Sequence, residues 1–136
     1  MTKKNLNIIL KTENLSIGYK TKREDLMVAS NINIELEKGK LIGLVGANGI
    51  GKSTLLRTLI KVQPSLSGLI LINNKDLNQT RVQELAKKLS IVLTEQMTSK
   101  NLSVYELVAL GRHPYTNWVG NLSQNDIEII NKSLEL

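Results

Sequence analysis

The residues best suited to chemistry lie together at positions 46–54, which read Gly-Ala-Asn-Gly-Ile-Gly-Lys-Ser-Thr. Positions 46–53 match G-x-x-x-x-G-K-[ST], the pattern of a loop that binds nucleotide phosphates. Glycine lets successive backbone N–H groups point at one anion and lets the backbone approach it closely. Lys52 brings a positive charge suited to the β- and γ-phosphates. Five residues of the loop are expected to form the phosphate site: Gly46, Asn48, Gly49, Gly51 and Lys52.

Two hydroxyl side chains follow the lysine and extend this expected site. The Ser53 hydroxyl suits Mg²⁺, a cation that prefers oxygen ligands and keeps several waters. The Thr54 hydroxyl suits the α-phosphate. Both residues open a helix, and the free N–H groups and dipole of a helix N-terminus favour an anion. The pattern therefore predicts phosphate and magnesium binding, but it does not choose among ATPases, GTPases and kinases.

Composition argues against several other kinds of chemistry. The 136 residues include no cysteine, so disulfides, thiolate metal sites and thiol nucleophiles are excluded. His113 is the single histidine, and because a metal site needs several ligands, we expect it in a loop or on the surface. The net charge of +6 comes from dispersed residues with only 3% aromatics, which does not indicate a nucleic-acid groove. No apolar run approaches the ~20 residues of a membrane helix, and no signal peptide is recognised.

A phosphate-binding loop needs a strand before it and a helix after it. Residues 41–45, Leu-Ile-Gly-Leu-Val, are mostly apolar and predict a strand covered on both faces. Residues 52–60 predict the helix, which Gln63-Pro64 ends. Residues 32–36 alternate apolar and polar side chains, the pattern of a half-buried strand. Further elements are expected at 6–15, 69–72 and 90–93 as strands and at 80–89 as a helix.

The last third of the chain predicts two helices. The Ser103–Glu106 stretch has the spacing of a capping box and predicts a helix from Val104 that Gly111 ends. Ser123–Asp126 repeats the spacing and predicts a second helix. Three residues of that helix are expected to face inward: Ile127, Ile130 and Leu134. Because the helical pattern still runs at Leu136, we expect the chain to be the N-terminal part of a longer protein.

The surroundings of the loop resemble the ATP-binding subunit of ABC transporters. "GANGIGKSTLLRTL", the upstream "SNINIELEKGKLIGLVG" and the downstream "PSLSGLILINNKDL" are similar to that family in order and spacing. The resemblance runs from about Leu6 to Leu136. It implies an α/β fold: a P-loop NTPase core with an antiparallel β subdomain over about 1–95, followed by the start of a helical subdomain over about 96–136. It also implies ATP and Mg²⁺ as cofactors.

The resemblance assigns two further site residues. The family places an aromatic residue before the loop, where it stacks on adenine, and Tyr19 stands at that position; alternatively, Tyr19 only packs over a strand end. The family also has a glutamine that reaches Mg²⁺ and the attacking water. Here the sequence reads "TEQ", and Thr94 stands at the position of that glutamine. Either Gln96 fills the role of the glutamine through a shifted loop, or Glu95 or Thr94 takes its position. We assign the catalytic and metal role to Gln96, with Glu95 as the alternative, beside Lys52 and Ser53.

The segment "LSVYELVALGRHPYTNW", residues 102–118, resembles subunits that energise uptake of iron–siderophores, haem and cobalamin. In that family this region lies near the membrane subunit. Five residues are therefore candidates for docking: Leu102, Tyr105, Arg112, Pro114 and Tyr115. Tyr105, Leu107 and Leu110 could instead form the inner face of a helix, and for Leu107 and Leu110 we favour that interpretation.

The resemblance implies a subunit that couples ATP hydrolysis to uptake at the cytoplasmic face of the inner membrane. Its partners would be transmembrane permease subunits, a second ATPase subunit and, indirectly, a substrate-binding protein. The family's "LSGGQ" signature and Asp-Glu strand would follow Leu136, so we expect these 136 residues to bind ATP without turning it over. The alternatives are a nucleotide-binding module that never hydrolyses, or an ABC ATPase with another substrate or a role outside transport.

Overall fold

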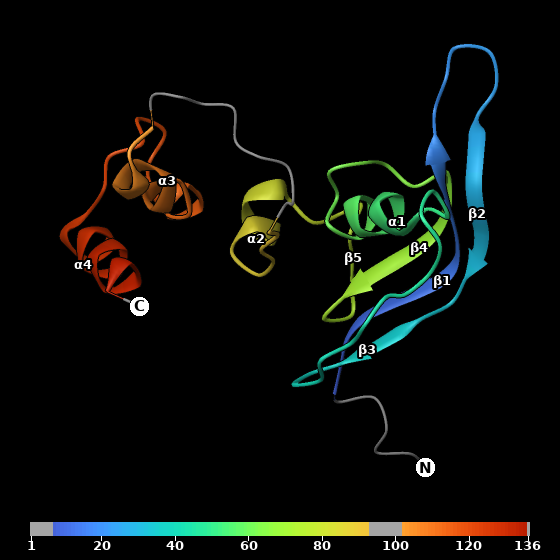
Figure 1. The fold of residues 1–136 in the computed structure, drawn as a ribbon, viewed down its shortest axis with the longest axis horizontal. Helices are drawn as coiled ribbons and strands as arrows, with labels where there is room; N and C mark the ends of the chain where they lie inside the picture. Colours follow the sequence, from blue (N-terminus) through green and yellow to red (C-terminus); the bar gives the residue numbers. More distant parts are fainter. Residues whose placement is uncertain (1–6, 93–101, 136) are drawn as a thin grey trace. The chain divides into compact units, whose positions relative to one another are not determined.

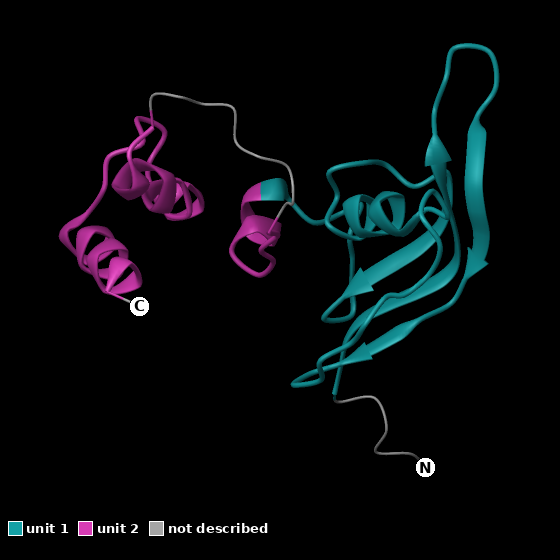
Figure 2. Cartoon of the chain, viewed as in Figure 1, with its two compact units in different colours: residues 1–82 teal, residues 83–136 magenta. Residues whose placement is uncertain are grey.

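The computed structural model describes residues 7–92 and 102–135 of the chain. The chain forms two compact units, residues 1–82 and 83–136 (Figure 2). The subdomain boundary expected near residue 95 lies outside the described residues and stays a prediction.

The first unit contains an antiparallel sheet, with one helix packed on it (Figure 1). Its strands are β1 (Ile8–Tyr19), β2 (Leu26–Ile32), β3 (Glu35–Glu37), β4 (Ser67–Ile72) and β5 (Lys75–Asp76). The strand order is β2-β1-β4-β5, and β3 also pairs with β1. The long strand β1 therefore lies in the middle, with β2 and β3 along one edge and β4 along the other. The predicted antiparallel β subdomain is confirmed.

The core of this unit lies where helix α1 (Lys52–Leu59) packs against β1 (Figure 1). Leu15 and Ile17 of β1 are fully buried, and Thr58 and Leu59 on α1 are buried too. The Thr58 hydroxyl donates to the Thr54 carbonyl at 2.8 Å, so a polar group is satisfied inside the helix. The predicted helix at 52–60 is confirmed to within one residue.

The predicted strand at 32–36 is interrupted. Ile32, Ile34 and Leu36 are half-buried as the alternation requires, but β2 ends at Ile32 and β3 begins at Glu35. The Thr12 hydroxyl lies at the break, where it donates to the Ile32 carbonyl at 2.9 Å and accepts from the Ile34 N–H at 3.1 Å. The Thr12 N–H also donates to the Ile34 carbonyl at 2.9 Å, so the backbone and side chain of one β1 residue together bind both sides of the break.

The strand predicted at 41–45 does not form. Leu41 and Val45 are almost fully exposed, and the segment pairs with no strand among residues 7–92 and 102–135. An apolar strand is stable when neighbouring strands bond its backbone and helices cover both faces, and the described residues supply neither. The strand expected at 90–93 is likewise absent at residues 90–92, and residue 93 lies outside the described part.

The helix expected at 80–89 is shorter, because α2 spans only Val82–Ala86 and of its residues Leu85 alone is buried.

The second unit confirms both predicted capping boxes. Helix α3 (Val104–Leu110) begins after Ser103, and α4 (Gln124–Leu134) begins after Ser123. A short 3₁₀ helix, η2 (His113–Tyr115), lies between them and contains the single histidine. Gly111 ends α3 as expected.

The inward faces of these two helices are only partly as predicted. Ile130 is fully buried and Ile127 half-buried, but Leu134 is exposed. Leu107 and Leu110 are exposed as well, so the inner-face interpretation of these two residues is wrong. The half-buried residues of α3 are Val108 and Ala109, which lie between Leu107 and Leu110 in the sequence, so the covered side of this helix is rotated from the expected one.

No helix in the described ranges is long and apolar enough to cross a bilayer.

Candidate phosphate-binding site

The loop from Gly46 to Gly51 joins α1 through a left-handed residue. Gly51 is the N-cap of α1 with φ 106° and ψ 8°. A Cβ atom at this residue would lie 2.6 Å from Cγ1 of Val28 on β2, closer than any atom can approach without a shift. Glycine is therefore required at this end of the loop both for its backbone angle and for its close approach to the sheet.

Lys52 is the first residue of α1, and its side chain turns back over the loop. Its Nζ donates to the Gly46 carbonyl at 2.6 Å and to the Ala47 carbonyl at 2.7 Å. These two bonds hold the ammonium group beside the start of the loop, six residues away in sequence. The positive charge is thus fixed at the place where the pattern predicts phosphate.

A cavity of about 300 Å³ lies between the loop, α1 and the end of β1. It is lined by seven of the residues singled out from the sequence: Tyr19, Asn48, Gly49, Gly51, Lys52, Ser53 and Thr54. Gly46 is linked to the cavity through its bond to Lys52. The structure therefore brings the predicted ligands of the loop together around one space.

Tyr19 reaches this cavity from the last position of β1. Its hydroxyl lies 3.2 Å from the Thr54 hydroxyl. Tyr19 is 44% exposed, so part of this residue is accessible to a ligand. Tyr19 also lines a second cavity of about 310 Å³, with Gly18, Lys20, Arg57, Val62, Gln63 and Pro64. The ring thus stands between two spaces, one at the loop and one beside the end of α1.

The electrostatics of the first cavity favour an anion. The first turn of α1 reads Lys-Ser-Thr-Leu and so carries one positive and no negative charge. The leading N–H groups of a helix lack intrahelical partners and carry the positive end of its dipole. Here the Leu55 N–H bonds to the Gly51 carbonyl at 2.8 Å, which shows where the helical ladder begins. A phosphate group at this place would meet backbone donors, an ammonium group and two hydroxyls.

The residues present also fit a magnesium ion held together with phosphates. No group of three His, Cys, Asp or Glu side chains that could bind a metal by itself exists within residues 7–92 and 102–135. Mg²⁺ usually binds through one or two protein oxygens, substrate phosphates and water, and Ser53 supplies such an oxygen. Thr94, Glu95 and Gln96 lie outside the described residues, so the assignment to Gln96 stays a prediction.

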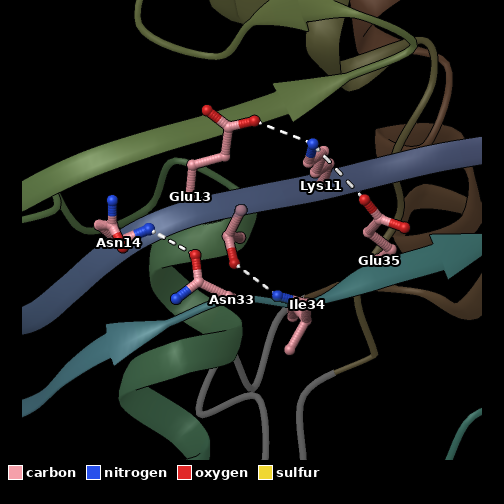
Figure 3. Close-up of a pocket in the computed structure, with 7 residues that line it drawn as sticks. Lys11, Glu13, Asn14, Asn33, Ile34 and Glu35 are labelled. Atoms are coloured by element: carbon pink, nitrogen blue, oxygen red, sulfur yellow. Dashed lines mark hydrogen bonds and ion pairs between the residues drawn. The ribbon is translucent and has the colours of Figure 1, made fainter.

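A wider hollow of about 610 Å³ lies over β1 and the β2–β3 break, and it is lined by Lys11, Thr12, Glu13, Asn14, Asn33, Ile34 and Glu35 (Figure 3). The Lys11 ammonium group lies 2.9 Å from the Glu13 carboxylate and 3.5 Å from the Glu35 carboxylate. Glu13 foremost raises the pKa of Lys11 above 10.5. Because the Lys11 ammonium group already pairs with both carboxylates, we assign no ligand to this hollow.

The docking candidates differ in how their side chains are engaged. Leu102, Tyr105 and Tyr115 are exposed and Pro114 is half-buried. The Arg112 guanidinium stacks on the Tyr115 ring at 4.0 Å and lies 2.8 Å from the Asp126 carboxylate. Arg112 therefore holds parts of its own unit together.

Sequence reasoning missed the partner of Arg112. Asp126 is buried, and its carboxylate accepts from the Ser123 hydroxyl at 2.6 Å, from the Ser123 N–H at 2.9 Å and from Arg112 Nε at 2.8 Å. The Ser123 bonds, with a further contribution from Arg112, lower the pKa of Asp126 to about 2. The capping pattern predicted the bonds between Ser123 and Asp126. The ion pair of Arg112 with Asp126 joins residues 14 positions apart, so no local sequence pattern predicted it.

Comparison with known proteins identifies relatives along most of the chain. Residues 29–136 match the family model for ABC transporters. An uncharacterised ABC transporter ATP-binding protein of Methanocaldococcus jannaschii is 39% identical over 92% of this chain and 42% of its own length. The iron(3+)-hydroxamate import ATP-binding protein FhuC of Bacillus subtilis is 36% identical over 93% of this chain and 45% of its own. The probable siderophore transport system ATP-binding protein YusV of the same bacterium is 33% identical over 93% of this chain and 44% of its own length.

Solved structures show the same fold. The bacterial ABC transporter cassette MJ0796, solved as a dimer, superposes with a TM-score of 0.73 at 25% identity over 93% of this chain and 54% of that one. This confirms the predicted fold class, although the chain spans less than half the length of the curated relatives named above. The match over residues 29–136, together with these relatives, shows that the chain belongs to the ABC transporter family.

Proposed function

We propose that this chain is the nucleotide-binding part of the ATP-binding subunit of an ABC importer. The whole subunit would couple ATP hydrolysis to uptake of an iron–siderophore, haem or cobalamin. The observation that carries the proposal is the convergence of the loop, Lys52, Ser53, Thr54 and Tyr19 on one cavity at the start of α1.

Each of these residues has a distinct task in the proposed site. Lys52 would exchange its bonds to the Gly46 and Ala47 carbonyls for bonds to the β- and γ-phosphate oxygens, which are charged and therefore stronger acceptors. Thr54 would donate to the α-phosphate once its contact with Tyr19 is released. The Tyr19 ring would stack on adenine, a contact that depends on ring area rather than on base-specific hydrogen bonds.

Mg²⁺ would be held by the Ser53 hydroxyl and, outside the described residues, by Gln96 or Glu95. When bound, the ion neutralises charge on the phosphates. The residues of this chain would contribute mainly by positioning, because phosphoryl transfer to water relies on alignment and electrostatic stabilisation.

The transported substrate and the partners are proposed from the relatives. FhuC and YusV are named for hydroxamate import and siderophore transport, which supports an iron chelate over other cargo. We propose that two such subunits pair, as MJ0796 does in its dimeric structure. They would bind permease subunits at the cytoplasmic face of the membrane through the exposed surface near α3, and a substrate-binding protein would deliver the cargo.

Isothermal titration calorimetry with ATP and Mg²⁺ tests the nucleotide site directly. Lys52→Ala is expected to weaken binding at least tenfold, since a hydrogen bond to a charged group contributes about 1.5–3 kcal/mol. Lys132→Ala, which removes the same charge from the last turn of α4, serves as the matched control and should leave the affinity unchanged. Equal affinities for both variants, or no binding by the wild type, would overturn the proposal.

A further inference from the structure

Lys61 lies just beyond the C-terminal end of α1 in an unusual backbone conformation. Its φ of 63° is left-handed, a conformation found after many helices and usually taken by glycine. The last turn closes around it, because the Lys61 N–H bonds to the Thr58 carbonyl at 3.1 Å and the Val62 N–H bonds to the Arg57 carbonyl at 3.0 Å. A long charged side chain therefore occupies a place where a glycine would be less strained.

The Lys61 ammonium group binds three backbone carbonyls of one turn. Its Nζ donates to the carbonyls of Leu77 at 2.9 Å, Asn78 at 3.2 Å and Thr80 at 2.8 Å. An ammonium group has three N–H donors, so this set of oxygens matches its full capacity. Two of the three bonds are partly buried.

The turn that supplies these carbonyls is built independently of Lys61. The Asp76 carboxylate accepts from the Asn78 N–H at 2.8 Å, and the Asp76 carbonyl accepts from the Thr80 hydroxyl at 2.8 Å. Leu77 anchors the turn, since its side chain is buried and its N–H bonds to the Ile70 carbonyl on β4 at 2.9 Å. The three oxygens are thus held in place by the turn's own hydrogen bonds.

Neutral carbonyl oxygens at these distances suit a large monovalent cation. The carbonyl oxygens lie 2.8–3.2 Å from the Lys61 nitrogen, which is the range of N–H···O hydrogen bonds. Oxygens held around a centre at these distances are too far from it for calcium, which needs roughly 2.3–2.6 Å, or magnesium, which needs roughly 2.0–2.1 Å. Backbone carbonyls that replace the hydration shell are the ligands of potassium in channels. We propose that the turn at residues 76–80 is a binding site for a monovalent cation of the ammonium and potassium class, occupied in this protein by the ammonium group of Lys61.

These bonds fix the C-terminal end of α1, the helix that follows the phosphate-binding loop. The cation site ties Lys61, the second residue past α1, to the turn that follows β5. The start of α1 is held separately, through Gly51 and Tyr19. The proposal does not depend on the nucleotide function, because its test needs no nucleotide.

The deciding experiment removes the side chain and offers free cations instead. Lys61→Gly keeps the left-handed backbone accessible and opens the three carbonyls to solvent. Its melting temperature is expected to rise by about 3 °C or more when tetramethylammonium chloride is replaced by ammonium or potassium chloride at equal ionic strength. The wild type should show no such difference, because its site is already filled.

Asn74→Gly is the matched control. Asn74 also has a left-handed φ, 61°, and lies in the turn between β4 and β5, so glycine relieves the backbone there without touching the carbonyls. This variant should respond to the choice of cation as the wild type does. If Lys61→Gly responds no more than Asn74→Gly, the proposal is overturned.

A measurement on the wild type guards against a variant that does not fold. In a ¹⁵N-labelled sample, the ammonium hydrogens of a lysine bound to three carbonyls exchange slowly with water. We expect one slowly exchanging lysine ammonium signal, which disappears in Lys61→Arg. Fast exchange of every lysine ammonium group would contradict the occupied site.

Discussion

At the scale of single residues, a comparison of Gly51 with Gly39 distinguishes two reasons why a position requires glycine: a left-handed backbone and a lack of space for a Cβ atom. Gly51 has φ 106° and a Val28 methyl 2.6 Å from the position of a Cβ atom. Gly39 also has a left-handed φ, 75°, but no heavy atom of the described residues lies within 4 Å of such a Cβ. One position therefore combines backbone strain with a clash, whereas the other has the strain alone.

Gly51→Ala is expected to destabilise the protein more than Gly39→Ala. Both variants bear a left-handed strain of about 1–2 kcal/mol, but only the first also displaces Val28. Urea denaturation of the two variants measures the difference. Val28→Ala in the Gly51→Ala background should recover the contact part of the loss, and equal losses in both single variants would refute this account.

A second test at the scale of residues asks whether Tyr19 contributes to ATP binding through its ring or through its hydroxyl group. Tyr19→Phe keeps the ring and removes the contact with Thr54, so ATP affinity should stay within about threefold. Tyr19→Ala removes the ring and should weaken ATP binding about tenfold, since stacking on a base contributes about 1–3 kcal/mol. Calorimetric titration distinguishes the two. Should both variants bind as the wild type does, Tyr19 only packs over the end of β1.

At the scale of elements, the two capping boxes show which parts of a fold can be predicted from residues close together in the sequence. Ser103 and Ser123 could be assigned from the sequence because a capping box involves residues only three apart. The phosphate loop could be assigned for the same reason. The segment 41–45 could not, because a buried strand depends on partners far along the chain, and none pairs with it among the described residues. The contact of Gly51 with Val28 is likewise a tertiary contact without a local signal.

The capping box of α4 leads to a prediction on pH dependence. The pKa of Asp126 is about 2 in the folded chain against an ordinary value of 3.8. As the pH falls, the unfolded chain binds this proton first, so protonation favours unfolding. The stabilisation from Asp126 should therefore be complete above about pH 4 and disappear as the pH falls through 2.

Thermal unfolding followed by circular dichroism between pH 5 and pH 2 measures this effect on α4. Asp126→Asn lacks the titrating group, so the difference in stability between wild type and variant should shrink across that range. Ser103 and Glu106 of α3 remain intact in both proteins and provide the internal reference. A difference that stays constant with pH would rule out Asp126 as its source.

At the scale of the whole molecule, the described residues include large apolar side chains that are exposed to solvent. Leu41, Val45, Val92 and Trp118 are each at least 90% exposed. Apolar surface of this kind binds hydrophobic dyes and promotes association. Composition alone did not reveal it, because an apolar content of 41% is ordinary for a folded domain.

The double variant Leu41→Asn, Val45→Asn is expected to lower the fluorescence of the dye ANS bound to the native protein. Its stability should change by no more than about 0.5 kcal/mol, since exposed positions contribute little. Leu15→Asn, at a fully buried position of β1, should by contrast abolish or strongly weaken folding. If the double variant is as destabilising as Leu15→Asn, residues 41–45 are packed rather than exposed.

The central place of β1 in the sheet also governs the timing of folding during synthesis. Leu10 of β1 pairs with Leu36 of β3 on one side and with Ile72 of β4 on the other. Strand β1 therefore waits for the partner of its second edge until residue 72 has been made, roughly 3 to 12 s after Leu10 at 5–20 residues per second. Once β3 is complete at Glu37, β1 keeps one open edge until β4 has been made. The nascent chain is thus open to wrong strand pairing along this edge until β4 emerges, and the rate of translation between residues 37 and 72 sets how long that edge stays open.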